Sequence, residues 1–232
     1  MNLLCTSGRA RSRALLVAAA ALAVPLALVA SSPAKAAILA LGLDTVFTGS
    51  APDGAAPWIT ATFDDSFGDA NTVRLTLSAG NLSGKENVKD WAFNFDPLLD
   101  AAFLTFTAID IADSIPVSVT SGNNFWQADG DGRFDIRFRL PPPKGQMNLR
   151  LTGGESIVYD ITYTSAIDVN SFNYSSVMGG GNGSFLSAAH IQNTGPQNKQ
   201  SGRIGAVPEP STFLLLGVGL AGFASIRPKF AR

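Results

Sequence analysis

Cysteine is nearly absent from this chain. Of its 232 residues only Cys5 is a cysteine, and it lies before the first apolar segment. Any domain that follows this segment therefore folds without disulfides, even in an oxidising compartment. The same absence excludes cysteine nucleophiles and metal sites built on thiolates.

Histidine is as scarce as cysteine. His190 is the only one, which excludes a zinc site built from several histidines. One histidine is enough for a general base, but the chain has no G-x-S-x-G motif to supply a matching nucleophile. We therefore interpret His190 as a structural or surface residue, and we predict that the chain is not an enzyme.

Long helical patterns are missing from residues 37–206. The best helical candidate is the short segment 97–102, which begins with a proline, as a first helical turn can. This part of the chain shows instead alternation with a period of two, which is typical of half-buried strands. The alternation is clearest at Thr72–Leu77, Arg133–Leu140 and Ile157–Tyr163.

Shorter apolar runs add further strand candidates. They are residues 58–63, 89–95, 104–109, 116–120, 169–174 and 184–191. We expect residues 192–206 to form a last hairpin or a loop ahead of a short linker. Many short strands separated by glycine-rich turns favour an antiparallel β-sandwich over residues 37–206, with a closed barrel as the alternative.

The charge of the chain is unevenly distributed. The whole sequence has a net charge of −1, whereas residues 37–206 carry 10 basic and 17 acidic side chains, a net charge of −7. Such an acidic domain repels phosphate backbones. We therefore predict no nucleic-acid partner, while cations, neutral glycans and basic proteins stay possible partners.

The N-terminus has the pattern of a secretory signal peptide. Three arginines precede an apolar stretch at 14–30, and Ala34 and Ala36 are small residues at the two positions that a signal peptidase reads. We predict a signal helix within residues 1–36 that signal peptidase removes after Ala36. A retained membrane anchor is the alternative.

The C-terminus has three parts in a fixed order. Val207, Pro208, Glu209 and Pro210 come first, and the nearly uniform apolar stretch 211–226 follows. Because two of these residues lack an amide donor, the first part is expected to be extended and exposed. The apolar stretch, with its flanks, approaches the roughly 20 residues that a transmembrane helix needs. The basic residues behind it hold the end of the chain on the cytoplasmic side; they are Arg227, Lys229 and Arg232.

This ending resembles the PEP-CTERM sorting signal of exported proteins in Gram-negative bacteria. The resemblance covers residues 207–232. It implies that an exosortase cuts near Pro208-Glu209-Pro210 and moves the domain from an inner-membrane precursor to the cell surface or extracellular matrix. It also implies a setting of exopolysaccharide or biofilm. A permanent anchor that is never cut is the alternative.

Three carboxylates lie in a glycine-rich segment, Asp129-Gly130-Asp131-Gly132-Arg133-Phe134-Asp135. Asp129, Asp131 and Asp135 resemble the start of calcium loops such as those of dockerin repeats, and hard oxygen ligands suit Ca²⁺. The next expected carboxylate is replaced by Leu140, and the flanking pattern is that of strands. We favour a hairpin turn, which a calcium ion could also stabilise.

Large aromatic residues suggest two roles. Trp91, Phe93 and Phe95 fall on one face of a predicted strand, and three such rings in step are typical of a core. Trp58 and Trp126 lie near predicted turns. They could form an exposed platform on which sugar rings stack, which would make the domain a carbohydrate-binding module.

Paired carboxylates suggest a third class, a glycan hydrolase. Asp64 and Asp65 are neighbours on a predicted strand, so they point to opposite faces and cannot flank one bond. We therefore favour a non-catalytic surface or matrix protein associated with exopolysaccharide. A carbohydrate-binding module, stabilised by calcium, is the first alternative, and a hydrolase is the second.

Overall fold

The computed structural model describes residues 37–111, 118–129, 132–140, 150–181 and 183–208. The predicted signal helix within 1–36 and the predicted transmembrane helix at 211–226 lie outside the described residues. In the part that is described, no helix is both long and apolar enough to cross a membrane.

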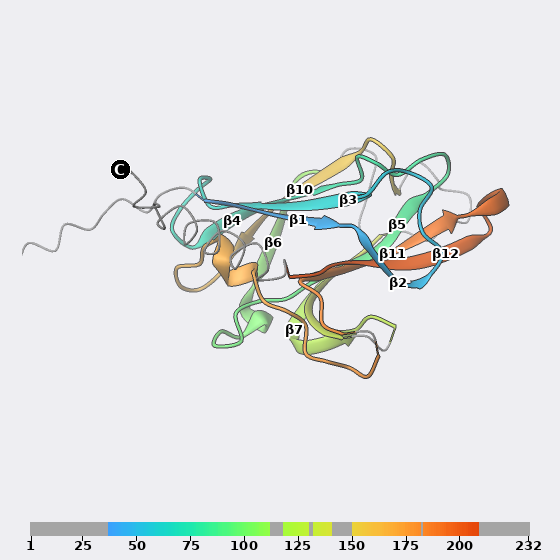
Figure 1. Ribbon diagram of the computed structural model, residues 1–232. Coiled ribbons are helices and arrows are strands. Elements are labelled where there is room, and N and C mark those ends of the chain that lie inside the picture. Colours follow the sequence, from blue (N-terminus) through green and yellow to red (C-terminus); the bar gives the residue numbers. More distant parts are fainter. Residues whose placement is uncertain (1–36, 112–117, 130–131, 141–149, 182, 209–232) are drawn as a thin grey trace, which may run out of the picture. The chain divides into compact units, whose positions relative to one another are not determined.

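The described residues form two antiparallel sheets (Figure 1). The five-stranded sheet has the order β1-β3-β4-β10-β6, with bounds Ile38–Leu43, Ile59–Asp64, Thr72–Ser78, Ser156–Thr162 and Thr105–Asp110. The seven-stranded sheet has the order β2-β12-β11-β5-β8-β7, with bounds Thr45–Gly49, Gln200–Ala206, Ser187–Thr194, Asn87–Phe93, Arg133–Arg139 and Ser118–Gln127, and β9 (Leu151–Thr152) pairs with β5. The prediction of an all-β, antiparallel fold is confirmed.

Side chains of both sheets share one hydrophobic core. Alternation along β4 places Val73, Leu75 and Leu77 in it with no exposed surface. The ring of Phe63 on β3 meets that of Phe93 on β5 edge to face, with centroids 5.5 Å apart. Each fully buried large apolar side chain of this kind contributes about 1.5–3 kcal/mol relative to exposure. The two sheets are therefore held together by their facing apolar sides.

One predicted strand is wrong. Residues 169–174 contain the 3-10 helix η3 (Val169–Phe172), which Asp168 begins with a reciprocal capping box to Ser171. Val169 and Phe172 are both buried, which fits the three-residue period of a 3-10 helix. The ring of Phe172 stacks on Phe63 with centroids 4.6 Å apart. Capping and this core contact outweigh the apparent alternation of the segment.

Three strands were missed by the sequence patterns: β1, β2 and the two-residue β9. β1 is a continuous apolar run, Ile38-Leu39-Ala40-Leu41-Gly42-Leu43, with no alternation of polar residues. It pairs with β3 in the five-stranded sheet, whereas β2 pairs with β12 in the other sheet. The chain thus passes from one sheet to the other around Asp44, a connection that short-range patterns do not reveal.

One predicted hairpin is confirmed, and a predicted short helix is confirmed only in part. Residues 192–206 belong to a hairpin in which β11 pairs with β12, and β12 continues to Ala206. No separate linker precedes Val207, contrary to expectation. The segment 97–102 is only partly helical, because the 3-10 helix η1 occupies Ala101–Phe103. A further 3-10 helix, η4 (Pro196–Asn198), lies between β11 and β12.

Candidate functional site

The chain leaves the folded part at the end of β12. Ala206 is 3% exposed, and its carbonyl accepts a hydrogen bond from the amide of Leu186 at 2.8 Å. Val207 is 41% exposed and follows directly. The ordered sheet therefore extends to within three residues of Glu209.

A groove of about 630 Å³ lies beside this exit. Residues 39–42 of β1 line it together with residues 206–208. β1 is the first strand in the order of the five-stranded sheet. Val207 and Pro208 thus leave the domain alongside the outer edge of β1.

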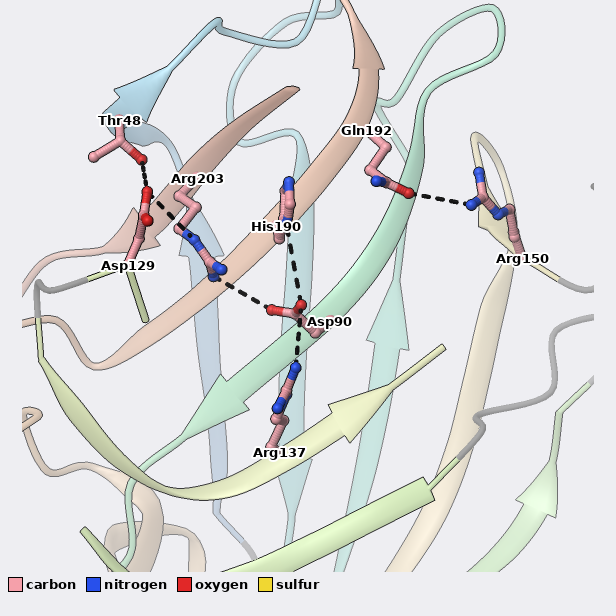
Figure 2. Close-up of polar contacts among 8 residues, drawn as sticks. All are labelled: Thr48, Asp90, Asp129, Arg137, Arg150, His190, Gln192 and Arg203. Atoms are coloured by element: carbon pink, nitrogen blue, oxygen red, sulfur yellow. Dashed lines mark hydrogen bonds and ion pairs between the residues drawn. The ribbon is translucent and has the colours of Figure 1, made fainter. Parts of the chain in front are cut away.

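A second polar site lies on the seven-stranded sheet, around the buried carboxylate of Asp90 (Figure 2). Its oxygens lie 3.4 Å from Arg203 Nη1, 3.6 Å from Arg137 Nη2 and 3.9 Å from His190 Nδ1. Strand register brings these residues together, because Asp90 on β5 is opposite His190 on β11, which is opposite Arg203 on β12. Arg137 comes from β8 on the other side of β5. A carboxylate on a side chain that is only 2% exposed needs such partners.

His190 is the weakest partner of Asp90. Burial, followed by the positive charge of Arg203, lowers the pKa of His190 to about 4 despite the opposing effect of Asp90. The imidazole is therefore neutral at neutral pH. A base of such low pKa removes protons poorly under these conditions, which agrees with the structural interpretation of His190.

Neither Trp58 nor Trp126 has the free, exposed ring that the predicted sugar-stacking platform requires. Trp58 is 8% exposed and donates a hydrogen bond from Nε1 to the carbonyl of Gly54 at 2.6 Å, so the prediction of an exposed ring is wrong. Trp126 is half-buried, and its ring centroid lies 4.3 Å from Arg137 Cζ and 5.5 Å from Arg203 Cζ. It packs within the polar site.

Two of the three predicted calcium ligands have partners within the protein. Asp129 accepts a hydrogen bond from Thr48 Oγ1 at 2.9 Å, and one of its oxygens lies 3.7 Å from Arg203 Nε. Asp135 accepts hydrogen bonds from the amides of Phe95 at 2.9 Å and Asn124 at 2.6 Å.

Asp131, the third predicted ligand, lies outside the described residues. Among residues that are described, no group of three or more His, Cys, Asp and Glu side chains is placed to hold a metal ion. The segment does join β7 to β8 as a hairpin, with Asp129 at a φ of 49°. The antiparallel pairing on both sides of the segment is thus confirmed, whereas calcium binding stays a prediction.

The adjacent acids Asp64 and Asp65 do not form a pair. Asp64 Oδ1 accepts from the amide of Ser66 at 2.8 Å, and Asp65 Oδ1 accepts from the amide of Ala37 at 2.6 Å. Sequence reasoning named neither Asp65 nor Asp90 as a site residue. Asp90 did carry a signal, because it is the second of two adjacent charged residues directly before the apolar run Trp91-Ala92-Phe93 of β5.

Comparison with known proteins identifies the end of the chain. A family model described as the PEP-CTERM protein-sorting motif matches residues 206–227. No curated protein and no solved structure matches the chain. The motif marks an exported protein that exosortase sorts, as the resemblance of the ending implied. Its first residue, Ala206, is also the last residue of β12.

Proposed function

Since the chain carries the PEP-CTERM protein-sorting motif, we propose that it is a β-sandwich protein delivered to the cell surface or extracellular matrix. Exosortase cuts it near Pro208-Glu209-Pro210 and releases the domain from a membrane-anchored precursor. The observation that carries this proposal is the match at residues 206–227, which begins where the fold ends.

The position of β12 supports cleavage close to the folded domain. An extended chain spans at most about 3.5 Å per residue, so a cut within three residues of Ala206 falls within roughly 10 Å of the end of β12. The enzyme must therefore approach the groove between β1 and residues 206–208. We propose that the domain lies close to the membrane surface while the precursor is processed.

Mass spectrometry of the native C-terminus after cell fractionation tests this proposal. We expect the surface or medium fraction to contain protein that ends near Pro208-Glu209-Pro210 and lacks Arg227, Lys229 and Arg232. Mature protein that still ends in Arg232 and stays in the inner membrane would overturn it. A full-length chain in which Pro208, Glu209 and Pro210 are all replaced by alanine is the control, and it should accumulate uncut.

We propose that the delivered domain is non-catalytic and contributes to an exopolysaccharide or biofilm matrix. The partners of Asp90, a nearly fully buried acid, support this, since it lies between two arginines and a neutral histidine. Incubation of the processed protein with the polysaccharide of the producing cell should release no new reducing ends. Cleavage that disappears in His190→Gln would instead identify a hydrolase.

A carbohydrate-binding role is a second candidate, and an exposed aromatic residue favours it. Phe125 is 71% exposed on β7, next to the half-buried Trp126. Flat rings at such a position match the apolar faces of sugars. A glycan pull-down with Phe125→Ala should lose binding if this role is correct, while Phe67→Ala, which alters an exposed ring beside the other sheet, should retain it.

A further inference from the structure

The first described residue makes two hydrogen bonds to one aspartate. The amide nitrogen of Ala37 lies 2.6 Å from Asp65 Oδ1, and the amide of Asp65 donates to the carbonyl of Ala37 at 3.3 Å. β1 and β3 lie side by side (Figure 1), and their antiparallel pairing begins at the next pair, Ile38 and Asp64. Asp65 therefore extends this pairing to the very start of the folded part.

The carboxylate of Asp65 is held in place from a second side. Its Oδ2 lies 3.5 Å from the amide nitrogen of Val169, the first residue of η3. Ala37 itself packs against the main hydrophobic core. Both the carboxylate and the nitrogen that it contacts are thus half-buried and positioned by β1, β3 and η3.

The chemistry at Ala37 changes when the signal peptide is removed. Hydrolysis after Ala36 adds the hydroxyl of water to the Ala36 carbonyl and leaves the Ala37 nitrogen as an amine, which takes up a proton near neutral pH. A unit positive charge then replaces a neutral amide beside Asp65. The carboxylate already makes this hydrogen bond charge-assisted, and the new positive charge adds a direct Coulomb attraction to it.

We propose that Asp65 is the receptor for the α-ammonium group of the mature N-terminus. Removal of the signal peptide converts the hydrogen bond between Ala37 and Asp65 into an ion pair that fastens β1 to β3 and η3. The inference rests on the proposed export of the chain and on cleavage after Ala36. It adds a folding consequence to that step, because the domain becomes more stable when it is cut.

The neighbouring charged groups are engaged elsewhere, so Asp65 is the carboxylate available to bind the α-ammonium group of Ala37. Asp64 accepts a hydrogen bond from the amide of Ser66, and Asp168 accepts the amide of Ser171 at the start of η3. Arg74, the one cation on β4, forms an ion pair with Asp160 at 2.8 Å. Each of these groups has its own partner, whereas the Asp65 carboxylate faces Ala37.

A double-mutant cycle on processed, exported protein tests the proposal. One change inserts a serine between Ala36 and Ala37, which moves the ammonium group away but keeps an amide at Ala37. The other is Asp65→Asn. Because one ion pair is lost, the insertion should lower the melting temperature by about 2–4 °C in the presence of Asp65. In the Asp65→Asn background the same insertion should have almost no effect.

The intact mass of each protein distinguishes a failure of the predicted cleavage site from a failure of the receptor role of Asp65. A wild-type mature chain that begins at a residue other than Ala37 overturns both the predicted cleavage and the receptor role. A chain that begins at Ala37 and shows equal effects of the insertion in both backgrounds overturns only the receptor role.

A second measurement avoids any variant of Asp65 that fails to fold. Selective acetylation of the α-amine should lower the melting temperature of the wild-type protein to that of the insertion variant. The insertion variant treated in the same way is the control, and its melting temperature should not change. An unchanged wild-type melting temperature would contradict the proposal.

Discussion

Asp90 links four strands of the seven-stranded sheet through its side chain and its backbone pairing. Replacing it with alanine leaves Arg137 and Arg203 without their shared carboxylate in a largely buried place. We expect Asp90→Ala to lower the free energy of unfolding by about 3 kcal/mol, because an uncompensated buried charge is costly. Chemical denaturation measures the change.

The more exposed ion pair between Arg74 and Asp160 offers a matched control for Asp90. Its side chains are 27% and 21% exposed, compared with 2% for Asp90. Asp160→Ala should therefore cost clearly less, since water screens the charge that is left. Equal losses for the two variants would mean that the environment of Asp90 is not as closed as its burial indicates.

His190 makes stability depend on pH. Its folded pKa of about 4 lies below the ordinary value of 6.5, so the unfolded chain binds a proton more readily between these values. The stability that neutral, buried His190 contributes is fully present above its unfolded pKa. It is lost as the pH falls toward its folded pKa. From about pH 7.5 to about pH 5 the wild type should lose roughly 2 kcal/mol more than His190→Gln. Parallel unfolding profiles for the two proteins would contradict this expectation.

At the scale of elements, β12 depends on a close approach at Gly205. A Cβ atom there would lie 2.6 Å from Cδ1 of Phe185, whereas one at Gly80 would meet nothing closer than 3.6 Å. We expect Gly205→Ala to destabilise the domain by about 1–3 kcal/mol, the usual cost of overpacking. Gly80→Ala is the control and should be close to neutral. Thermal or chemical unfolding of both variants measures the two changes in stability, and equal changes would contradict the expectation.

The hairpin between β7 and β8 allows a test of calcium. Asp129 and Asp135 already accept hydrogen bonds from the protein, as a turn held without an ion requires. We expect a chelator to leave the melting temperature of the processed protein unchanged. A lower midpoint in chelator that added Ca²⁺ restores would instead support the calcium loop suggested by Asp129, Asp131 and Asp135.

At the scale of the whole molecule, charge limits the choice of partner. Residues 37–206 carry 17 acidic and 10 basic side chains, so the processed domain has a net charge of −7 before its termini are counted. We expect no shift of double-stranded DNA by this protein, even at low salt where phosphate contacts are strongest. Salt-sensitive DNA binding would show that a local basic surface outweighs the net charge.

Much of the fold follows from local patterns. Alternation in β4, β8 and β10 predicted their position and their buried faces, because a half-buried strand needs a period of two. η3 and β1 did not follow. The first is decided by its capping box and by the contact of Phe172 with Phe63 across the core, and the second by pairing with β3. Both contacts join residues that are distant in the sequence, so neither can be predicted from a local pattern.

The sequence alone determined that this protein carries a sorting motif, because the order of proline, apolar stretch and basic end is a property of consecutive residues. It also determined the all-β class through alternation. Only the tertiary structure decided that Asp90 meets Arg137, His190 and Arg203, and that Asp65 meets Ala37. These residues are far apart in the chain, and strand register alone brings them within reach of one another.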